Sequence, residues 1–383
     1  MLLEPKSPKE LCGVLADTAA RGHTITLGGH FSKRLMAGPV GPSDVTISTA
    51  AMTRVLQYEP RDLTISVEAG VTYAEVSRVL AANRQMIPLD PPFSDAATIG
   101  GILGANTSGP RRRLYGTARD LVIGMKFATL DGKLVQSGGM VVKNVAGLDM
   151  GKLMIGSFGT LAAIATVNFK LLPKPAVERT ALLSFDTLAG AIEARDRTIR
   201  SVLQPEAVDL LNPLVAAQIG QRGYVLAVQF GGNAAVADRY ERELGALGSA
   251  AFLAGGEEAK FWRTIQNYTP RFMEKFTEGA VVRVSATISQ VRDAMHSLEV
   301  PAIARAANGV CYGYFSRTDA AVKWMAAARR RPWRAVIEFA PEPEKAKLEL
   351  WPAPGTDFAM MKKVKQMFDP RNLLNNGRLY RLI

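Results

Sequence analysis

Small residues dominate one stretch of this chain, and that stretch constrains the fold more than any other. Residues 97–109 read Ala-Thr-Ile-Gly-Gly-Ile-Leu-Gly-Ala-Asn-Thr-Ser-Gly, so nine of thirteen are Gly, Ala, Ser or Thr. Without bulky side chains the backbone can approach a large flat ligand, and its N–H groups can face a phosphate. The tract therefore predicts a dinucleotide-type ligand held against the main chain.

The size and composition indicate a globular chain of more than one domain. Single cores rarely grow beyond about 250–300 residues, so 383 residues predict two domains. A hydrophobic content of 48% and a charged content of 21% lie in the ordinary globular range. The first twenty residues lack a signal-peptide pattern, and the longest apolar stretch, residues 153–169, contains glycines and polar residues that argue against a membrane span. We therefore expect a cytoplasmic location.

The cysteine, histidine and charge content limits the chemistry. Two cysteines cannot ligate an iron–sulfur cluster, which takes about four thiolates, and three scattered histidines predict no metal site. The net charge is +12, with arginine runs at 111–113 and 329–331. These runs fit solvated loops or helix ends, and no basic aromatic module accompanies them, so we expect no nucleic-acid partner. The positive charge could instead attract an anionic cofactor, an anionic substrate or an acidic partner subunit.

Capping signals and apolar patterns outline the first half of the chain. Ser7-Pro8-Lys9-Glu10 predicts a helix over 8–20, and Thr72-Tyr73-Ala74-Glu75 predicts another to about residue 83. Strands are expected at 24–27, 45–48, 55–58 and 63–68. The first of these strands runs into Gly28-Gly29-His30, a turn suited to presenting backbone amides to a pyrophosphate.

The second half of the chain alternates strands and helices. Asp131-Gly132 predicts a two-residue hairpin turn with positive φ at both positions, between strands at 121–130 and 133–136. A short helix at 149–155 and a long strand at 161–172 precede the prolines at 173 and 175, which mark a domain boundary. Beyond them we expect strands at 181–185, 224–230, 280–285, 309–315 and 334–339, alternating with helices at 187–200, 233–246, 257–268, 289–298 and 318–330. This order predicts an antiparallel sheet with helices on one face.

Three parts of the chain together resemble the FAD-binding domain of the vanillyl-alcohol oxidase and p-cresol methylhydroxylase (PCMH) superfamily. They are residues 28–33, residues 90–172 and residues 368–380. The diagnostic motifs are Ser108-Gly109-Pro110-Arg111-Arg112 before Tyr115-Gly116, and Gly138-Gly139 followed by Val142-Lys143-Asn144-Val145-Ala146-Gly147. Within the superfamily, the chain resembles the family of smaller FAD-binding subunits of bacterial glycolate oxidases.

The resemblance implies an α+β fold and a domain plan. It implies a PCMH-type FAD-binding domain of two α+β subdomains over 1–175, an α+β cap for substrate or subunit contacts over 176–355, and a segment that returns to the FAD domain over 356–383. It also implies where FAD binds: residues 28–32 around the pyrophosphate, residues 98–101 and 106–109 beside the isoalloxazine and ribityl chain, and residues 159, 160 and 164 near the adenine. The implied cofactor-binding residues are Gly28, Gly29, His30, Phe31, Ser32, Pro92, Thr98, Ile99, Gly100, Gly101, Asn106, Thr107, Ser108, Gly109, Arg112, Gly116, Lys143, Gly159, Thr160, Ile164 and Arg378.

Some of these residues have alternative interpretations. His30 replaces a usual glycine, and in other branches a histidine here bonds covalently to the flavin; the remainder of the chain resembles a branch without that bond, and the alternative is a histidine that hydrogen-bonds a phosphate or a carbonyl. Arg378 belongs either near the flavin or in a surface salt bridge. Arg112 and Lys143 are expected to place positive charge near the flavin or substrate.

The resemblance implies glycolate oxidation to glyoxylate within a complex. Related catalytic flavin subunits carry a histidine-rich metal motif, whereas the C-terminal half here has only His296. We therefore assign no catalytic residue and expect a catalytic flavin subunit and an iron–sulfur subunit as partners, with peripheral membrane association through them. Tyr312 and Tyr314 either face the flavin or pack in the core. The alternatives are an independent FAD-dependent 2-hydroxyacid dehydrogenase and a non-redox scaffold with a vestigial flavin site.

Overall fold

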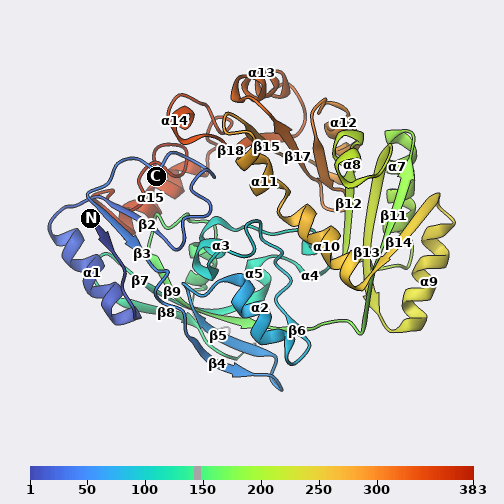
Figure 1. Ribbon diagram of the computed structural model, residues 1–383. Coiled ribbons are helices and arrows are strands. Elements are labelled where there is room, and N and C mark those ends of the chain that lie inside the picture. Colours follow the sequence, from blue (N-terminus) through green and yellow to red (C-terminus); the bar gives the residue numbers. More distant parts are fainter. Residues whose placement is uncertain (142–147) are drawn as a thin grey trace. The chain divides into compact units, whose positions relative to one another are not determined.

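The chain forms two compact units in a computed structural model that describes residues 1–141 and 148–383 (Figure 1). Unit 1 comprises Met1–Ser108, Gly116–Lys174 and Ala353–Ile383. Unit 2 comprises Gly109–Tyr115 and Pro175–Pro352. Residues 109–115, which begin at the last residue of the small-residue tract, therefore pack with unit 2.

The first layer of unit 1 is a parallel sheet in the order β1-β3-β2, backed by helix α1 (Pro8–Ala20). Ser7 caps α1, because its side chain accepts a hydrogen bond from the Glu10 N–H, as the capping box predicts. Leu11 and Leu15 of α1 are buried in one cluster with residues of the strands. The strands are β1 (Leu2–Leu3), β2 (Ile25–Gly28) and β3 (Val45–Ser48).

The second layer of unit 1 is an antiparallel sheet in the order β4-β5-β9-β7-β8. Its strands and the helices that pack with it bury an apolar core. A short pair, β6 with β10, lies beside it. The elements are β4 (Val55–Glu59), β5 (Thr64–Glu68), α2 (Tyr73–Ala81), β6 (Gln85–Met86), α3 (Ile99–Ala105), α5 (Ala118–Leu121), β7 (Val122–Ala128), β8 (Leu134–Gly138), α6 (Met150–Met154), β9 (Ala163–Lys170), β10 (Leu172–Pro173) and α15 (Phe358–Phe368).

The hairpin β7-β8 forms, but the predicted two-residue turn is wrong. Its loop covers residues 129–133, where Thr129 N–H donates to Lys133 O at 3.0 Å and Gly132 N–H donates to Thr129 O at 3.0 Å. Gly132 has φ +77°, whereas Asp131 is not left-handed. Asp131 instead accepts a hydrogen bond from the Thr129 hydroxyl, and this polar loop selects a longer connection.

Unit 2 is built on an antiparallel sheet in the order β14-β11-β13-β12-β16-β17-β15-β18, which confirms the predicted antiparallel arrangement. Alternate side chains, such as Ala181 and Leu183 of β11, meet α7, α9, α12 and α13 in one core. On the opposite face Thr180 accepts a hydrogen bond from Trp262 of α10 at 2.7 Å. The elements are α4 (Arg112–Tyr115), β11 (Val177–Phe185), α7 (Leu188–Arg200), β12 (Ala207–Leu211), α8 (Pro213–Ala216), β13 (Tyr224–Gly232), α9 (Ala234–Gly245), β14 (Ser249–Ala254), α10 (Gly255–Gln266), α11 (Tyr268–Lys275), β15 (Ala280–Ser285), α12 (Val291–His296), β16 (Ala302–Arg305), β17 (Val310–Phe315), α13 (Thr318–Ala328), β18 (Arg334–Phe339) and α14 (Glu342–Lys345).

Helix length and polarity bear on membrane contact. Over residues 1–141 and 148–383, no helix combines the length and the apolar character that a bilayer crossing requires.

Candidate functional site

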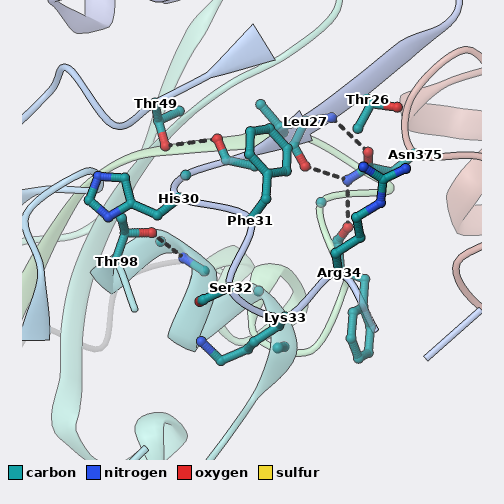
Figure 2. Close-up of a pocket in the computed structure, with 18 of the residues that line it drawn as sticks. Thr26, Leu27, His30, Phe31, Ser32, Lys33, Arg34, Thr49, Thr98 and Asn375 are labelled. Atoms are coloured by element: carbon teal, nitrogen blue, oxygen red, sulfur yellow. Dashed lines mark hydrogen bonds between the residues drawn. The ribbon is translucent and has the colours of Figure 1, made fainter. Parts of the chain in front are cut away.

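Unit 1 contains a cavity lined by glycines, apolar residues and basic side chains (Figure 2). Residues far apart in the sequence meet around it: the loop after β2, the small-residue helix α3, the turn before β9, and the C-terminal segment. The lining residues are Thr26, Leu27, Gly28, Gly29, His30, Phe31, Ser32, Lys33, Arg34, Val40, Thr49, Thr98, Gly100, Gly101, Gly104, Ala105, Phe158, Gly159, Ala162, Ile164, Asn375 and Arg378.

The loop after β2 lines this cavity, and several of its backbone amides lack partners within the described chain. Ser48 Oγ donates to Gly29 O at 3.1 Å and Thr49 Oγ1 donates to Gly28 O at 3.3 Å, so both glycine carbonyls are occupied. None of the backbone N–H groups from Gly29 to Lys33 donates a hydrogen bond to a residue that the structure describes. Unpaired amides grouped at a turn are suited to an anion.

The two glycines of this loop are needed for space rather than for backbone conformation. A Cβ on Gly29 would overlap Thr98 Oγ1, and one on Gly28 would lie against the Phe31 ring. The left-handed residue of the loop is Phe31, with φ +53°. Thr98 in turn caps α3, because its Oγ1 accepts from Gly101 N–H at 3.3 Å. The loop and the small-residue helix are therefore fixed against each other (Figure 2).

Every described residue that lines the cavity is either positively charged or uncharged. Lys33, Arg34 and Arg378 line it, and no aspartate or glutamate does so in the described chain. Lys33 Nζ is buried without a hydrogen-bond partner among the residues that the structure describes, and this burial lowers the pKa of the Lys33 amine to about 8. Such a lining favours an anionic ligand.

The C-terminal segment closes one side of the cavity. Arg378 Nη1 donates to Gly38 O at 2.6 Å, and its guanidinium lies 5.6 Å from the centre of the Phe158 ring. Lys365 of α15 is buried and bonds Thr160 O at 2.8 Å and the Asp369 carboxylate at 2.7 Å. The Arg378 side chain thus binds a backbone carbonyl in the loop after β2. This role is neither the surface salt bridge nor the purely flavin-facing position that the sequence left open.

His30 lies exposed at the rim of the cavity. Its Nδ1 is 2.9 Å from Ala96 O, just before the Thr98 cap. This contact matches the interpretation of a histidine bonded to a nearby carbonyl, and it orients the ring so that Nε2 faces away from Ala96.

The structure brings together about half of the expected cofactor-binding residues. Those that line the cavity are Gly28, Gly29, His30, Phe31, Ser32, Thr98, Gly100, Gly101, Gly159, Ile164 and Arg378. Other expected residues of unit 1 lie outside the lining: Ile99 is buried in the core, Thr160 Oγ1 donates to Ser157 O, and Thr107 Oγ1 is buried without a partner in residues 1–141 and 148–383. Pro92, Asn106, Ser108 and Gly116 are also in unit 1 but not in the lining, and Gly109 and Arg112 belong to unit 2. Lys143 lies outside the described residues.

Several lining residues are not predicted by the sequence. They are Thr26, Leu27, Lys33, Arg34, Val40, Thr49, Gly104, Ala105, Phe158, Ala162 and Asn375. Lys33 and Arg34 follow the expected turn directly, so their position beside it is the available signal. Asn375 belongs to the C-terminal motif within residues 368–380, and Gly104 and Ala105 belong to the small-residue tract, so the sequence marks their segments but not their individual roles.

Unit 2 carries a polar cluster on the sheet face opposite α7. Arg305 pairs with the buried Asp209, and Arg283 pairs with Glu338 at 2.9 Å. Tyr312 lies between them, 5.7 Å from the Arg305 guanidinium, and burial raises the pKa of Tyr312 to about 12. Tyr314 is a core residue, since it is 2% exposed. No group of three His, Cys, Asp or Glu side chains suited to a metal occurs in the part of the chain that the structure describes.

The chemistry of the unit 1 cavity fits FAD. FAD is a dinucleotide whose pyrophosphate carries the negative charge, while its rings and ribityl chain are uncharged. The unpaired amides, the buried Lys33 amine and the lack of lining carboxylates in the described chain suit the pyrophosphate. The glycine-rich face of α3 leaves room for a flat ring.

Comparisons with known families and proteins agree with this fit. Residues 1–138 match the family described as FAD binding domain, and residues 344–379 match the C-terminal domain of FAD linked oxidases. The chain is 29% identical over 245 residues to the glycolate oxidase subunit GlcE of Escherichia coli, covering 63% of each protein. It is 31% identical over 195 residues to the mitochondrial D-lactate dehydrogenase [cytochrome] of Arabidopsis thaliana, covering 51% of this chain and 32% of that one. The chain thus spans less than two thirds of these relatives.

Solved structures show the same fold at low sequence identity. p-Cresol methylhydroxylase with substrate bound superposes with a TM-score of 0.75 at 15% identity, covering 100% of this chain and 88% of that one. Alkyldihydroxyacetonephosphate synthase superposes with a TM-score of 0.71 at 19% identity, covering 98% and 76%. The matched domains, the shared fold and the cavity agree: residues 1–138 match an FAD binding domain, the chain has the fold of p-cresol methylhydroxylase, and FAD is its cofactor.

Proposed function

We propose that this chain is the FAD-binding subunit of a glycolate oxidase complex that oxidises glycolate to glyoxylate. The observation that carries the proposal is the similarity to GlcE, which extends over the same share of both proteins. The glycolate oxidase subunit GlcD of Bacillus subtilis is also similar, at 27% identity over 213 residues.

The side chains near the cavity support a role in binding FAD more than in oxidising substrate alone. Oxidation of a 2-hydroxy acid needs a base for the hydroxyl proton while hydride goes to the flavin. Among the described lining residues, the His30 imidazole could accept that proton only through Nε2, because its Nδ1 contacts Ala96 O. We therefore propose that a partner flavin subunit contributes the substrate-oxidising residues.

The proposal also requires a separate iron–sulfur subunit. This chain has two cysteines, Cys12 and Cys311, and both are buried. Burial raises the pKa of the Cys311 thiol to about 12, so it stays protonated and does not ligate metal. Electron transfer beyond the flavins would pass through the third subunit, and any membrane association would come from the assembled complex.

A spectroscopic experiment tests this proposal. The visible spectrum of the purified chain is recorded before and after anaerobic addition of glycolate. We expect an oxidised FAD spectrum that glycolate does not bleach, and bleaching after addition of the co-expressed catalytic and iron–sulfur subunits. Failure of those subunits to co-purify with the chain would contradict the proposed complex.

A stand-alone FAD-dependent 2-hydroxyacid dehydrogenase is the second proposal. It is favoured by the similarity to D-lactate dehydrogenases, including one from Archaeoglobus fulgidus at 27% identity over 225 residues. The polar cluster of unit 2, with Arg283, Arg305 and Tyr312, offers the cations that a carboxylate substrate needs. Bleaching of the isolated chain by glycolate or D-lactate would favour this alternative. A non-redox scaffold would instead fail to retain any flavin.

A further inference from the structure

Lys33 is a buried cation that no described residue of the chain pairs. Lys33 lies in the loop after β2, next to Ser32, and its side chain lines the cavity (Figure 2). The residue is 9% exposed, and its Nζ has no hydrogen-bond partner among the described residues. A buried ammonium group without a partner carries a large desolvation cost, so a ligand is expected to complete its environment.

The surroundings of Lys33 indicate which ligand chemistry it meets. The charged and titratable side chains that line its cavity are His30, Arg34 and Arg378, and none is a carboxylate in the described chain. Arg378 already donates to Gly38 O at 2.6 Å and to Arg34 O at 3.4 Å. Lys33 therefore offers three unused donors at a place where five neighbouring backbone amides, residues 29–33, are also unpaired within the described chain.

We propose that Lys33 is the cation that neutralises the pyrophosphate of bound FAD, and that its amine takes up a proton when FAD binds at alkaline pH. The pyrophosphate is the anionic part of FAD, so a buried ammonium in the FAD cavity gains most from that group. Backbone amides orient the phosphates but add no net charge. The inference rests on FAD binding and is independent of whether glycolate is the substrate.

The proton uptake follows from the burial of the amine in the FAD-free chain. Burial lowers the pKa of Lys33 to about 8, and the nearby His30, Arg34 and Arg378 give no negative charge to oppose this. A bound pyrophosphate favours the ammonium form and raises that pKa. FAD affinity is therefore greatest below about pH 8 and falls as the pH rises, by about 10- to 30-fold between about pH 7 and about pH 9.5.

Titrations of FAD into the full chain stripped of its flavin test the inference. The wild type is compared with Lys33→Met, Lys33→Arg and the exposed control Lys9→Met on α1. We expect Lys33→Met to bind FAD about 10- to 100-fold more weakly at about pH 7 and to lose the pH dependence. Lys33→Arg stays charged and should bind with little pH dependence. Lys9→Met should match the wild type.

Two ligand fragments separate the pyrophosphate from the ring. ADP-ribose carries the pyrophosphate without the isoalloxazine, and riboflavin carries the ring without phosphate. Lys33→Met should weaken ADP-ribose as much as FAD and leave riboflavin unchanged. Equal weakening of riboflavin, or unchanged affinity for ADP-ribose, would overturn the inference.

Proton uptake gives a readout that does not depend on a variant folding. Calorimetry of FAD binding to the wild type at about pH 9, in two buffers of different ionisation enthalpy, should show close to one proton taken up. Binding without proton uptake, together with a flat pH profile, would overturn the inference even if Lys33→Met does not fold. Glycolate turnover plays no part in these measurements, so they remain decisive if the proposed function fails.

Discussion

Asn375 completes the hydrogen bonding of Leu27 from 348 residues further along the chain. Its Oδ1 accepts from the Leu27 N–H at 2.7 Å, and its Nδ2 donates to Leu27 O at 3.1 Å and to Phe158 O at 2.7 Å. Beside it, Ile25 and Leu374 form a parallel bridge. The Asn375 side chain thus satisfies the backbone groups of Leu27 at the edge of β2. It also joins three segments that line the FAD cavity (Figure 2).

Replacing Asn375 by Ala should destabilise the chain and weaken FAD binding. The change leaves the N–H and C=O of Leu27 without partners, and it places Ala at φ +44°, a left-handed conformation that Asn tolerates better. We expect a loss of about 2–3 kcal/mol in the free energy of unfolding, measured by urea unfolding of the flavin-free chain. The exposed neighbour gives a matched control: Asn376→Ala should change stability by less than about 0.5 kcal/mol. Equal effects at the two positions would contradict this role.

Gly29→Ala should disrupt the FAD cavity through Thr98. The added Cβ would overlap Thr98 Oγ1 and displace either the loop or the cap of α3. We expect a loss of about 1–3 kcal/mol in stability and weaker FAD retention. In a Thr98→Ala background the same substitution should cost less, so a double-mutant cycle should give a coupling of at least about 0.5 kcal/mol.

A glycine with open space around it serves as the control for this cycle. Gly13 lies within α1, and a methyl group added to its Cα would meet no neighbouring atom within 4 Å in the described chain. Gly13→Ala should therefore be neutral or stabilise the helix by about 0.5–1 kcal/mol. Strict additivity of Gly29→Ala and Thr98→Ala would show that the two residues do not constrain each other.

The comparison of Gly29 with Lys33 shows what the sequence can and cannot predict. Gly28-Gly29 after an apolar run predicts the strand and the turn, because glycine spacing and alternation are local signals. Glycine is required at position 29 because a side chain there would overlap Thr98. Thr98 lies 69 residues further along the chain, and no local sequence pattern predicts that the two residues meet. The sequence does not predict the role of Lys33, because a lysine after a turn is usually solvated and only the fold shows that it is buried.

Helices and strands, too, are predicted where the sequence carries a local signal and missed where it does not. The capping boxes at Ser7 and Thr72 predict two helices whose starts, Pro8 and Tyr73, agree with the structure. The small-residue tract predicts only a surface that a ligand can approach, whereas residues Ile99–Ala105 form α3, because Thr98 caps it and the core receives Ile99 and Ile102. The strands β12, β14 and β16 are not predicted. β12 and β16 are buried along almost their whole length and β14 is mostly exposed, so none of them alternates between apolar and polar residues.

Acid precipitation should release the flavin rather than leave it attached to His30. The Nδ1 of His30 is engaged with Ala96 O, and the rest of the chain resembles the branch with non-covalent FAD. We expect yellow colour in the supernatant and a colourless pellet, and His30→Ala should retain most of its FAD. A yellow pellet that becomes colourless in His30→Ala would instead identify His30 as a covalent anchor.

Asp120 should make the start of α5 sensitive to acid. Its Oδ2 accepts from the Thr117 N–H at 2.8 Å and from the Thr117 hydroxyl at 3.0 Å, and these bonds lower the pKa of the Asp120 carboxyl. Because the folded-state pKa lies below the unfolded value of about 3.9, the stabilisation is complete above about pH 5 and is lost as the pH falls through the folded pKa. Asp120→Asn should therefore be less stable than the wild type by about 0.5–1 kcal/mol at neutral pH, a small value since the carboxylate is exposed to solvent.

The pH profile of that difference separates a cap from a general charge effect. Urea unfolding of the wild type and Asp120→Asn between about pH 7 and about pH 2 should give two curves that converge below about pH 3. Asp95→Asn removes the same charge at another exposed position and should follow the wild-type curve throughout. A constant gap for Asp120→Asn down to the lowest pH would mean that the asparagine disturbs packing, since protonation of Asp120 would then have no effect on the gap.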